Sequence, residues 1–169
     1  EPWTIGIGKG FALLRDRYIE TENPFSEGTF RQSVTRKKGK ESLVEWIPSI
    51  PQAGNYAVYV SYKSLPESTD DALYTVYHKG GKTQFKVNQQ MGGGTWIYLG
   101  NFGFETGNND ACKVQLSNRS SKNNRIITAD GIKIGGGYGN IARKVNNAGI
   151  VTNNTKSSEN SGPMQKQNV

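Results

Sequence analysis

The chain has 169 residues, the length of one ordinary domain, and carries 21 Lys and Arg against 14 Asp and Glu, a net charge of +7. A single Cys and a single His exclude an intrachain disulfide and a Cys/His zinc site. The sequence contains no run of 18 apolar residues, the length that a membrane-spanning helix needs. Its 34% hydrophobic content, with 10% aromatic residues and 21 Gly, favours a turn-rich β protein over a helical bundle.

Short apolar segments, separated by Gly, Asn, Pro and Ser, predict the strands. Residues 11–19 suit a short helix and an edge strand equally. After them, strands are predicted at 44–47, 55–61, 72–78, 83–87, 95–99, 100–104, 111–116 and 125–134. Gly80-Gly81 predicts a two-residue hairpin turn. About eight strands with regular turn signals predict an all-β protein, a jelly-roll-like β-sandwich.

Composition divides the chain into three parts. Residues 1–10 read as a leader or linker, and residues 11–143 as the β-sandwich. Residues 144–169 are rich in Asn and Ser and almost lack large apolar side chains. Such a segment cannot bury enough surface to offset its ordering entropy, which predicts a flexible tail or linker.

Individual polar residues offer little catalytic chemistry. The glycine-rich segments lack the spacing of a nucleotide-binding loop, so no cofactor is predicted. His78 reads as a hydrogen-bonded strand residue and Cys112 as a small buried hydrophobe. Alternation over 125–134 places Asp130 on an apolar face with Thr128 and Ile132, where its carboxylate must be hydrogen-bonded. We interpret it as an acceptor for backbone N–H groups, with a ligand role as the alternative.

Two loops could attract ions. Asp70 and Asp71 are weak candidates for Ca²⁺, and a turn with a strand cap is the simpler interpretation. Lys37 and Lys38 lie in a dense basic turn, which is either a solvated hairpin tip or an attractant for an anionic partner. No nucleic-acid-binding module is visible, so nucleic acid is not predicted as a partner. An acidic polysaccharide or an anionic cell-wall polymer suits the same charge.

Aromatic rings with amide neighbours indicate sugar binding, because flat apolar faces with polar edges match pyranose rings. Each ring could equally fill the core, and Trp96 and Tyr98 alternate with Ile97 and Leu99, so only one of these pairs can face inward. Trp46 is a further ring of this kind. The predicted ligand-binding residues are Trp96, Tyr98, Tyr59, Tyr77, Asn88, Gln89, Lys37 and Lys38.

An ordered series of short motifs runs through the predicted strands and their turns. The motifs are Glu45 to Pro48, Ile50-Pro51, Ala53-Gly54, Tyr56 to Tyr62, Asp71-Ala72, Tyr74 to Val76, His78, Gly80-Gly81, Phe85, Val87 to Gln89, Gly93 to Trp96, Tyr98 to Gly100, Leu116 to Asn118 and Thr128 to Ile132. This series resembles the golvesin C-terminal-like domain, also described as a xanthan-lyase carbohydrate-binding-like domain, in the version found in Bacteroides proteins labelled xanthan lyase or N-acetylmuramoyl-L-alanine amidase. The match spans residues 11–143. The resemblance implies a jelly-roll sandwich, an extracellular or periplasmic setting and a non-catalytic accessory role beside a host catalytic domain.

Three functions follow from these features. The first is a carbohydrate-binding module for an acidic polysaccharide or peptidoglycan. The second is a structural spacer that positions its host without binding sugar. The third is a lyase or amidase in its own right, in which His78, Tyr77 and Arg125 could act together. Nothing in the sequence places these three residues side by side, and we therefore predict that this chain is not an enzyme.

Overall fold

The computed structural model describes residues 2–11 and 23–135, which form ten strands and one 3-10 turn. The predicted all-β sandwich is confirmed. Most of the segment expected at 11–19, and the whole tail expected at 144–169, lie outside the described residues. The elements are β1 (Thr4–Ile5), η1 (Pro24–Ser26), β2 (Arg31–Val34), β3 (Leu43–Trp46), β4 (Gly54–Ser61), β5 (Ala72–His78), β6 (Gly81–Val87), β7 (Ile97–Phe104), β8 (Val114–Ser117), β9 (Ile126–Ala129) and β10 (Gly131–Ile134).

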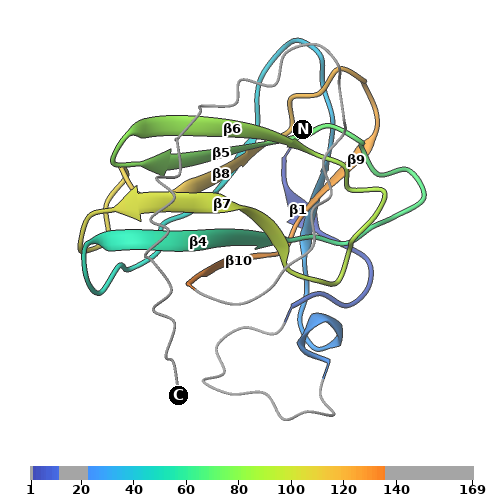
Figure 1. Ribbon diagram of the computed structural model, residues 1–169. Helices are drawn as coiled ribbons and strands as arrows, with labels where there is room; N and C mark the ends of the chain where they lie inside the picture. The colour runs from blue at the N-terminus through green and yellow to red at the C-terminus, as the bar shows by residue number, and fades with distance from the viewer. Residues whose placement is uncertain (1, 12–22, 136–169) are drawn as a thin grey trace, which may run out of the picture.

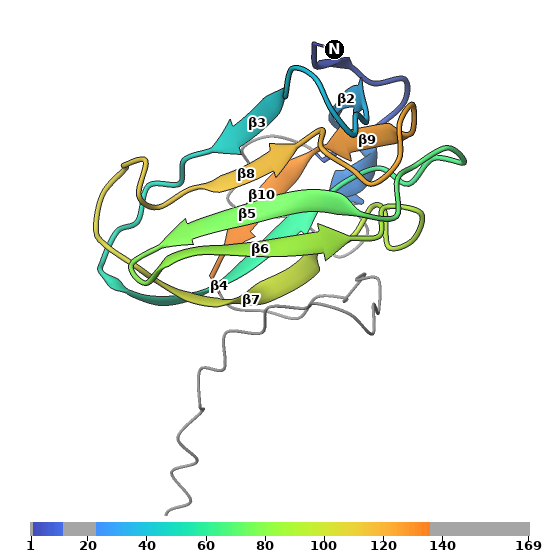
Figure 2. The same cartoon turned by 90° about the horizontal axis from the view of Figure 1, so that it is seen from above.

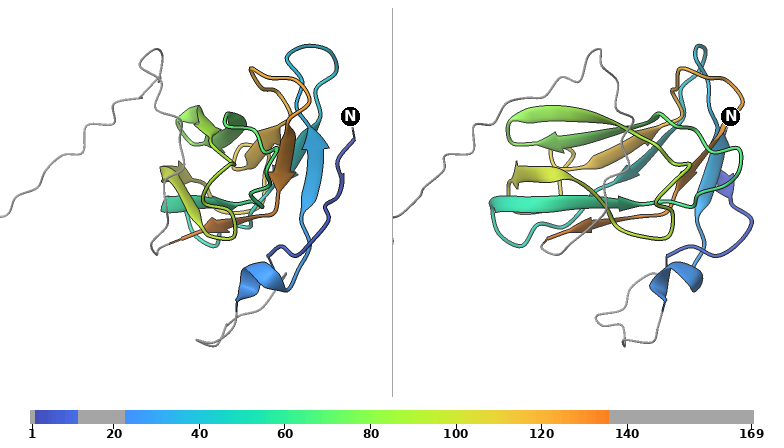
Figure 3. Two further views of the ribbon diagram at one scale, coloured as in Figure 1. Left: turned by 90° about the vertical axis from the view of Figure 1, so that its right-hand side faces the viewer. Right: turned by 45° about the vertical axis from the view of Figure 1, so that its right-hand side comes forward.

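The strands form three antiparallel sheets, ordered β3-β8-β5-β6, β10-β4-β7 and β1-β2-β9. The first two sheets lie face to face, as the view along the strands in Figure 3 shows. The third sheet lies at one end of the sandwich, on the right in Figure 1. β1 pairs with β2 through Thr4 and Ile5, so part of the segment expected as a leader at 1–10 is built into a sheet.

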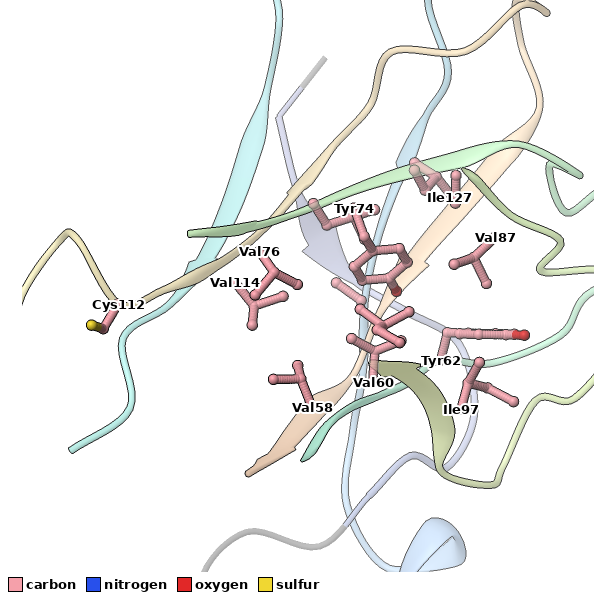
Figure 4. Close-up of a cluster of buried hydrophobic side chains, with 14 of the residues drawn as sticks. Val58, Val60, Tyr62, Tyr74, Val76, Val87, Ile97, Cys112, Val114 and Ile127 are labelled. Carbon is pink, nitrogen blue, oxygen red and sulfur yellow. The ribbon is translucent and has the colours of Figure 1, made fainter. Parts of the chain in front are cut away.

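The core lies between the layers (Figure 4). β4 supplies Val60, the residue after β4 is Tyr62, and β5 supplies Tyr74; all three side chains are completely buried. Burial of each large apolar side chain contributes on the order of 1.5–3 kcal/mol. The core also includes Cys112, as predicted.

β9 and β10 meet at Asp130, where the inward-facing positions change phase. Ile127 and Ala129 of β9 point into the core, whereas Ile132 and Ile134 of β10 pack against it. The expected continuous alternation across 125–134 is therefore wrong. At Asp130 the backbone passes from the β1-β2-β9 sheet to the β10-β4-β7 sheet. Because the two strands belong to different sheets, the inward-facing positions change from odd-numbered residues in β9 to even-numbered residues in β10.

The β5–β6 hairpin sets the register of the outer surface described below. The hairpin is present, but its two-residue loop is Lys79-Gly80, one residue earlier than the expected Gly80-Gly81. His78 pairs with Gly81, which begins β6 with a φ of +113°, a value that favours glycine. From this turn, Tyr77 pairs with Lys82 and Thr75 pairs with Gln84. Figure 2 shows β5 and β6 side by side in this hairpin. Because side chains alternate along a strand, every second residue of both strands lies on the outer side of the sheet.

Candidate functional site

The outer side of the β3-β8-β5-β6 sheet carries a grid of polar side chains that we call the polar face. Strand register places its members in cross-strand rows, with Glu45, Gln115, Thr75 and Gln84 in the middle row. Neighbouring strands lie about 4.8 Å apart, so these groups repeat at short, regular intervals. The polar face consists of Glu45, Thr75, Tyr77, Lys82, Gln84, Lys86, Lys113 and Gln115.

Hydrogen bonds orient the amides of the polar face without exhausting them. Gln115 Nε2 donates to Glu45 Oε1 at 2.8 Å, and Gln84 Nε2 donates to Thr75 Oγ1 at 3.3 Å. The Tyr77 hydroxyl donates to Gln115 Oε1 at 3.5 Å. Each amide NH₂ has two donors and each amide oxygen accepts twice. Both glutamines therefore keep donor and acceptor capacity for sugar hydroxyls.

Charges on the polar face are paired on one side and open on the other. Lys113 Nζ lies 2.8 Å from Glu45 Oε1 and 5.3 Å from the centre of the Tyr77 ring. The bond from Lys113 lowers the pKa of Glu45, and the bond to Glu45 raises the pKa of Lys113. Lys82 and Lys86 are exposed on the edge strand β6, and neither has an ion pair within residues 2–11 and 23–135. This edge attracts anions.

The other predicted rings lie on the opposite side of the sandwich, on the outer side of β10-β4-β7. Tyr59 and Tyr98 are cross-strand neighbours with ring centres 5.4 Å apart, and Lys133 Nζ lies 4.5 Å from the Tyr59 ring centre. Tyr59 is only 2% exposed. The structure therefore separates Tyr77 from Tyr59 and Tyr98, and it makes Tyr59 unsuited to stacking on a sugar.

Trp96 belongs to a cluster of rings at the same side. Its ring centre lies 4.8 Å from that of Phe11 and 5.4 Å from that of Phe25, both edge-to-face. Such packing occupies ring faces that a sugar would need. A second predicted ring, Trp46 of β3, packs against the core, as does the third tryptophan of the chain, Trp3. The three tryptophans thus contribute first to packing.

Gln89 and Asn88 lie in the loop after β6 and hold that loop. Gln89 is completely buried; its Nε2 donates to Thr128 O at 2.8 Å and to Tyr74 OH at 3.2 Å, and its Oε1 accepts from Thr128 N at 2.9 Å. No donor of the amide remains for a ligand. Asn88 Oδ1 accepts from Gln90 N at 3.0 Å in a local turn.

Lys37 and Lys38 are exposed in the loop between β2 and β3. Together with Lys40 and Arg119 they form a cluster that we call the basic tip. The Arg119 guanidinium donates to Gly39 O, which brings the loop after β8 against the lysine loop.

The candidate metal ligands are already engaged. Asp71 is 4% exposed and accepts from Thr69 Oγ1 at 2.7 Å, Ser120 Oγ at 2.5 Å and Ser121 N at 2.7 Å. Asp70 Oδ2 lies 2.9 Å from Lys122 Nζ. In the part of the chain that the structure describes, no three His, Cys, Asp or Glu side chains gather as a metal site would require. The two carboxylates support loops here.

The remaining chemically reactive residues also have structural partners. His78 Nε2 lies 2.9 Å from Thr83 Oγ1, its Nδ1 accepts from Gly80 N at 3.2 Å, and burial lowers its pKa. Both oxygens of Asp130 accept from Phe11 N, at 2.9 and 3.0 Å. The interpretation of Asp130 as an acceptor for backbone N–H groups agrees with this geometry.

The sequence reasoning missed most of the polar face. Gln84, Gln115, Thr75, Lys82 and Lys86 were not predicted as site residues, and Tyr77 was the only member chosen. The signal was present in the alternation of 72–78, whose outward positions pair across the hairpin with the polar positions of 82–86. Only the pairing of β8 between β3 and β5 shows that Gln115 joins the same surface.

Fold and surface together define an all-β sandwich domain with a polar outer sheet and no assembled catalytic group among its described residues. The model of the Golvesin C-terminal domain family matches residues 20–136, and the chain belongs to this family.

Two xanthan lyases are similar to the chain. The curated one, from Bacillus sp. (strain GL1), is 30% identical over 96 residues, which are 57% of this chain and 10% of the lyase. The solved structure of Paenibacillus xanthan lyase matches with a TM-score of 0.56 and 26% identity, over 78% of this chain and 12% of the lyase. This chain thus corresponds to about a tenth of each relative. No helix in the described residues is long and apolar enough to cross a membrane.

Proposed function

We propose that this domain is a non-catalytic accessory module that binds an acidic polysaccharide through the polar face. The observation that carries this proposal is the cross-strand row of amide and hydroxyl groups beside Tyr77, flanked by the two lysines of β6, which have no ion pair with any residue that the structure describes. Amides recognise sugar hydroxyls, and a tyrosine ring offers an apolar face with a polar edge.

The charge and the relatives support an acidic ligand and a host enzyme. The chain has a net charge of +7, which favours anionic polymers. The similar regions are small parts of xanthan lyases, so we place this module beside a host catalytic domain that acts on a polysaccharide. A setting outside the cytoplasm, extracellular or periplasmic, fits such a substrate. Peptidoglycan is the second glycan that this setting offers.

The test is a binding measurement with immobilised xanthan, other uronate polymers and peptidoglycan. Tyr77→Ala should weaken binding to the preferred polymer about tenfold, because it removes the only ring of the polar face. Tyr98→Ala is the matched control: it removes a half-buried tyrosine of the opposite sheet and should change binding less than twofold. Circular dichroism establishes that both variants are folded.

A structural spacer is the second candidate, favoured by the packing of Trp96 against Phe11 and Phe25 instead of toward a ligand. If the folded wild-type domain is retained on none of these polymers, or if Tyr98→Ala weakens binding as much as Tyr77→Ala, the polar-face proposal is wrong. Copurification of the domain with a separately expressed host domain would then support the spacer.

A further inference from the structure

The basic tip is a direct continuation of the polar face. The first residue of β3, Leu43, pairs with the last residue of β8, Ser117, so the two strands start and finish at the same end of the sheet. Beyond this pair, Ser42 N donates to Asn118 Oδ1 at 2.9 Å, and Arg119 N donates to Ser117 Oγ at 3.0 Å. The two strands that carry Glu45 and Gln115 of the polar face therefore lead into the two loops of the basic tip.

Backbone hydrogen bonds fix these two loops to each other. Arg36 N donates to Asn118 O at 2.9 Å, and Ser120 N donates to Arg36 O at 3.2 Å. Lys37 N donates to Asn123 Oδ1 at 2.7 Å. Because the backbones of the two loops are held together, the loop that carries the lysines needs little further ordering when a ligand binds, although the lysine side chains themselves stay free to adjust.

The lysines of the basic tip have no ion pair among the described residues. Lys37, Lys38 and Lys40 are absent from every ion pair within residues 2–11 and 23–135. The one carboxylate at the base of the tip among these residues, that of Glu41, accepts a hydrogen bond from Ser117 Oγ. Neighbouring cations of the same end are paired, since Lys122 contacts Asp70 and Arg125 contacts Glu67. Three lysines within four residues of sequence carry like charges that an anionic partner would neutralise.

We propose that the basic tip is a second subsite, specific for the carboxylates of an acidic polysaccharide that runs along β3 and β8 from the polar face. This inference rests on the proposed function and adds the direction of the bound chain and the recognition of its charge. Exposed Ser121, Asn123 and Asn124 stand beside the cations and can bond sugar hydroxyls. The basic tip contains no aromatic ring for stacking on bases, which favours a glycan over a nucleic acid.

The test compares xanthan with carboxyl-reduced xanthan, which keeps the hydroxyls and loses the charge. The tip variant is K37Q/K38Q, and its matched control is K9Q/K79Q, which removes two exposed lysines elsewhere. The tip variant should bind xanthan about fivefold more weakly, the effect of two exposed ion contacts, while the control stays within twofold. Neither variant should alter binding of the reduced polymer.

Salt dependence gives a second measurement on the same proteins. Raising salt from 50 to 200 mM should weaken wild-type binding to xanthan about 4- to 16-fold, as expected for one to two released counterions, and should weaken the tip variant less. The inference is overturned if the tip variant binds xanthan as tightly as wild type does. It is also overturned if wild type binds duplex DNA as tightly as xanthan and the tip substitutions weaken both interactions equally. Binding of neither polymer by the wild type would instead overturn the proposed function.

Discussion

At the residue scale, Asp71 is a buried carboxylate that supports the end of the domain where the basic tip lies. Burial by itself would raise the pKa of Asp71, but hydrogen bonds from Ser120, Ser121 and Thr69 together lower it to about 2. Those bonds join the loop before β5 to the loop after β8, and the second loop carries Arg119 of the basic tip. The charged form of Asp71 is thus the form that the fold requires.

A pH dependence of stability follows from that pKa. The folded pKa of about 2 lies below the reference value of 3.8, so the stabilisation is present above pH 3.8 and is lost as pH falls through 2. Wild type should lose about 1–2 kcal/mol of unfolding free energy over this window from Asp71. Asp71→Asn should lack this component, as measured by urea denaturation at pH 6 and below pH 3. Asp110→Asn, at an exposed carboxylate, should keep the wild-type dependence.

Single residues were predictable where one chemical rule dominated. A lone Asp in an apolar strand must accept hydrogen bonds, and Asp130 does. Gln89 looked like a polar loop residue because its sequence neighbours are polar. Its burial depends on contacts with Tyr74 and Thr128, which lie 15 and 39 residues away in sequence. Local pattern carries no signal for such a contact.

At the element scale, the segment before β7 depends on one glycine. A Cβ on Gly93 would lie 2.3 Å from Ser64 N, which is backbone and cannot move aside cheaply. Gly93 N also donates to Ser64 Oγ at 3.0 Å. This close approach holds the 92–94 loop against the segment after β4.

We therefore expect Gly93→Ala to lower the unfolding free energy by about 1–3 kcal/mol, the usual effect of overpacking. Gly54→Ala is the control, since a Cβ there would lie 3.7 Å from the Tyr56 ring, an ordinary contact. That substitution should leave stability unchanged or slightly higher. Thermal and urea unfolding measure the unfolding free energies of both variants. Equal unfolding free energies would contradict the role given to Gly93.

Strands with clear alternation were predicted, and short or continuous ones were not. β4 and β5 match the segments expected at 55–61 and 72–78 within one residue. Two expected segments at 95–99 and 100–104 form the single strand β7. β1 and β2 were missed because two to four residues with polar positions carry no periodic signal. β2 pairs with β9 and β1 pairs with β2, and both pairings depend on tertiary contacts.

At the scale of the whole molecule, the non-catalytic role that we propose requires that the domain cleave no polysaccharide by itself. His78 is bonded within the β5–β6 hairpin, and its neighbour Tyr77 shares the polar face with Lys113. The purified domain should release no unsaturated product from xanthan, as followed by ultraviolet absorbance over hours. Product formation that disappears in His78→Ala would show that the domain is an enzyme.

The class of fold could be predicted from the chain as a whole, whereas the site could not. Low apolar content with many turn residues is sufficient for an all-β sandwich. The polar face is assembled from β3, β5, β6 and β8, and their order in the sheet differs from their order in the chain. A surface of this kind is determined by topology, and only the pairing of strands reveals it.

The bend at Asp130 has a consequence for how the domain comes apart. β9 terminates one sheet and β10 terminates another, with a single residue between them. If either sheet unfolds, the backbone at Asp130 is no longer held. The apolar residues that pack against the other sheet are then exposed to solvent. The domain should therefore unfold cooperatively on heating, with one sharp calorimetric peak and no populated intermediate in which only one sheet is folded.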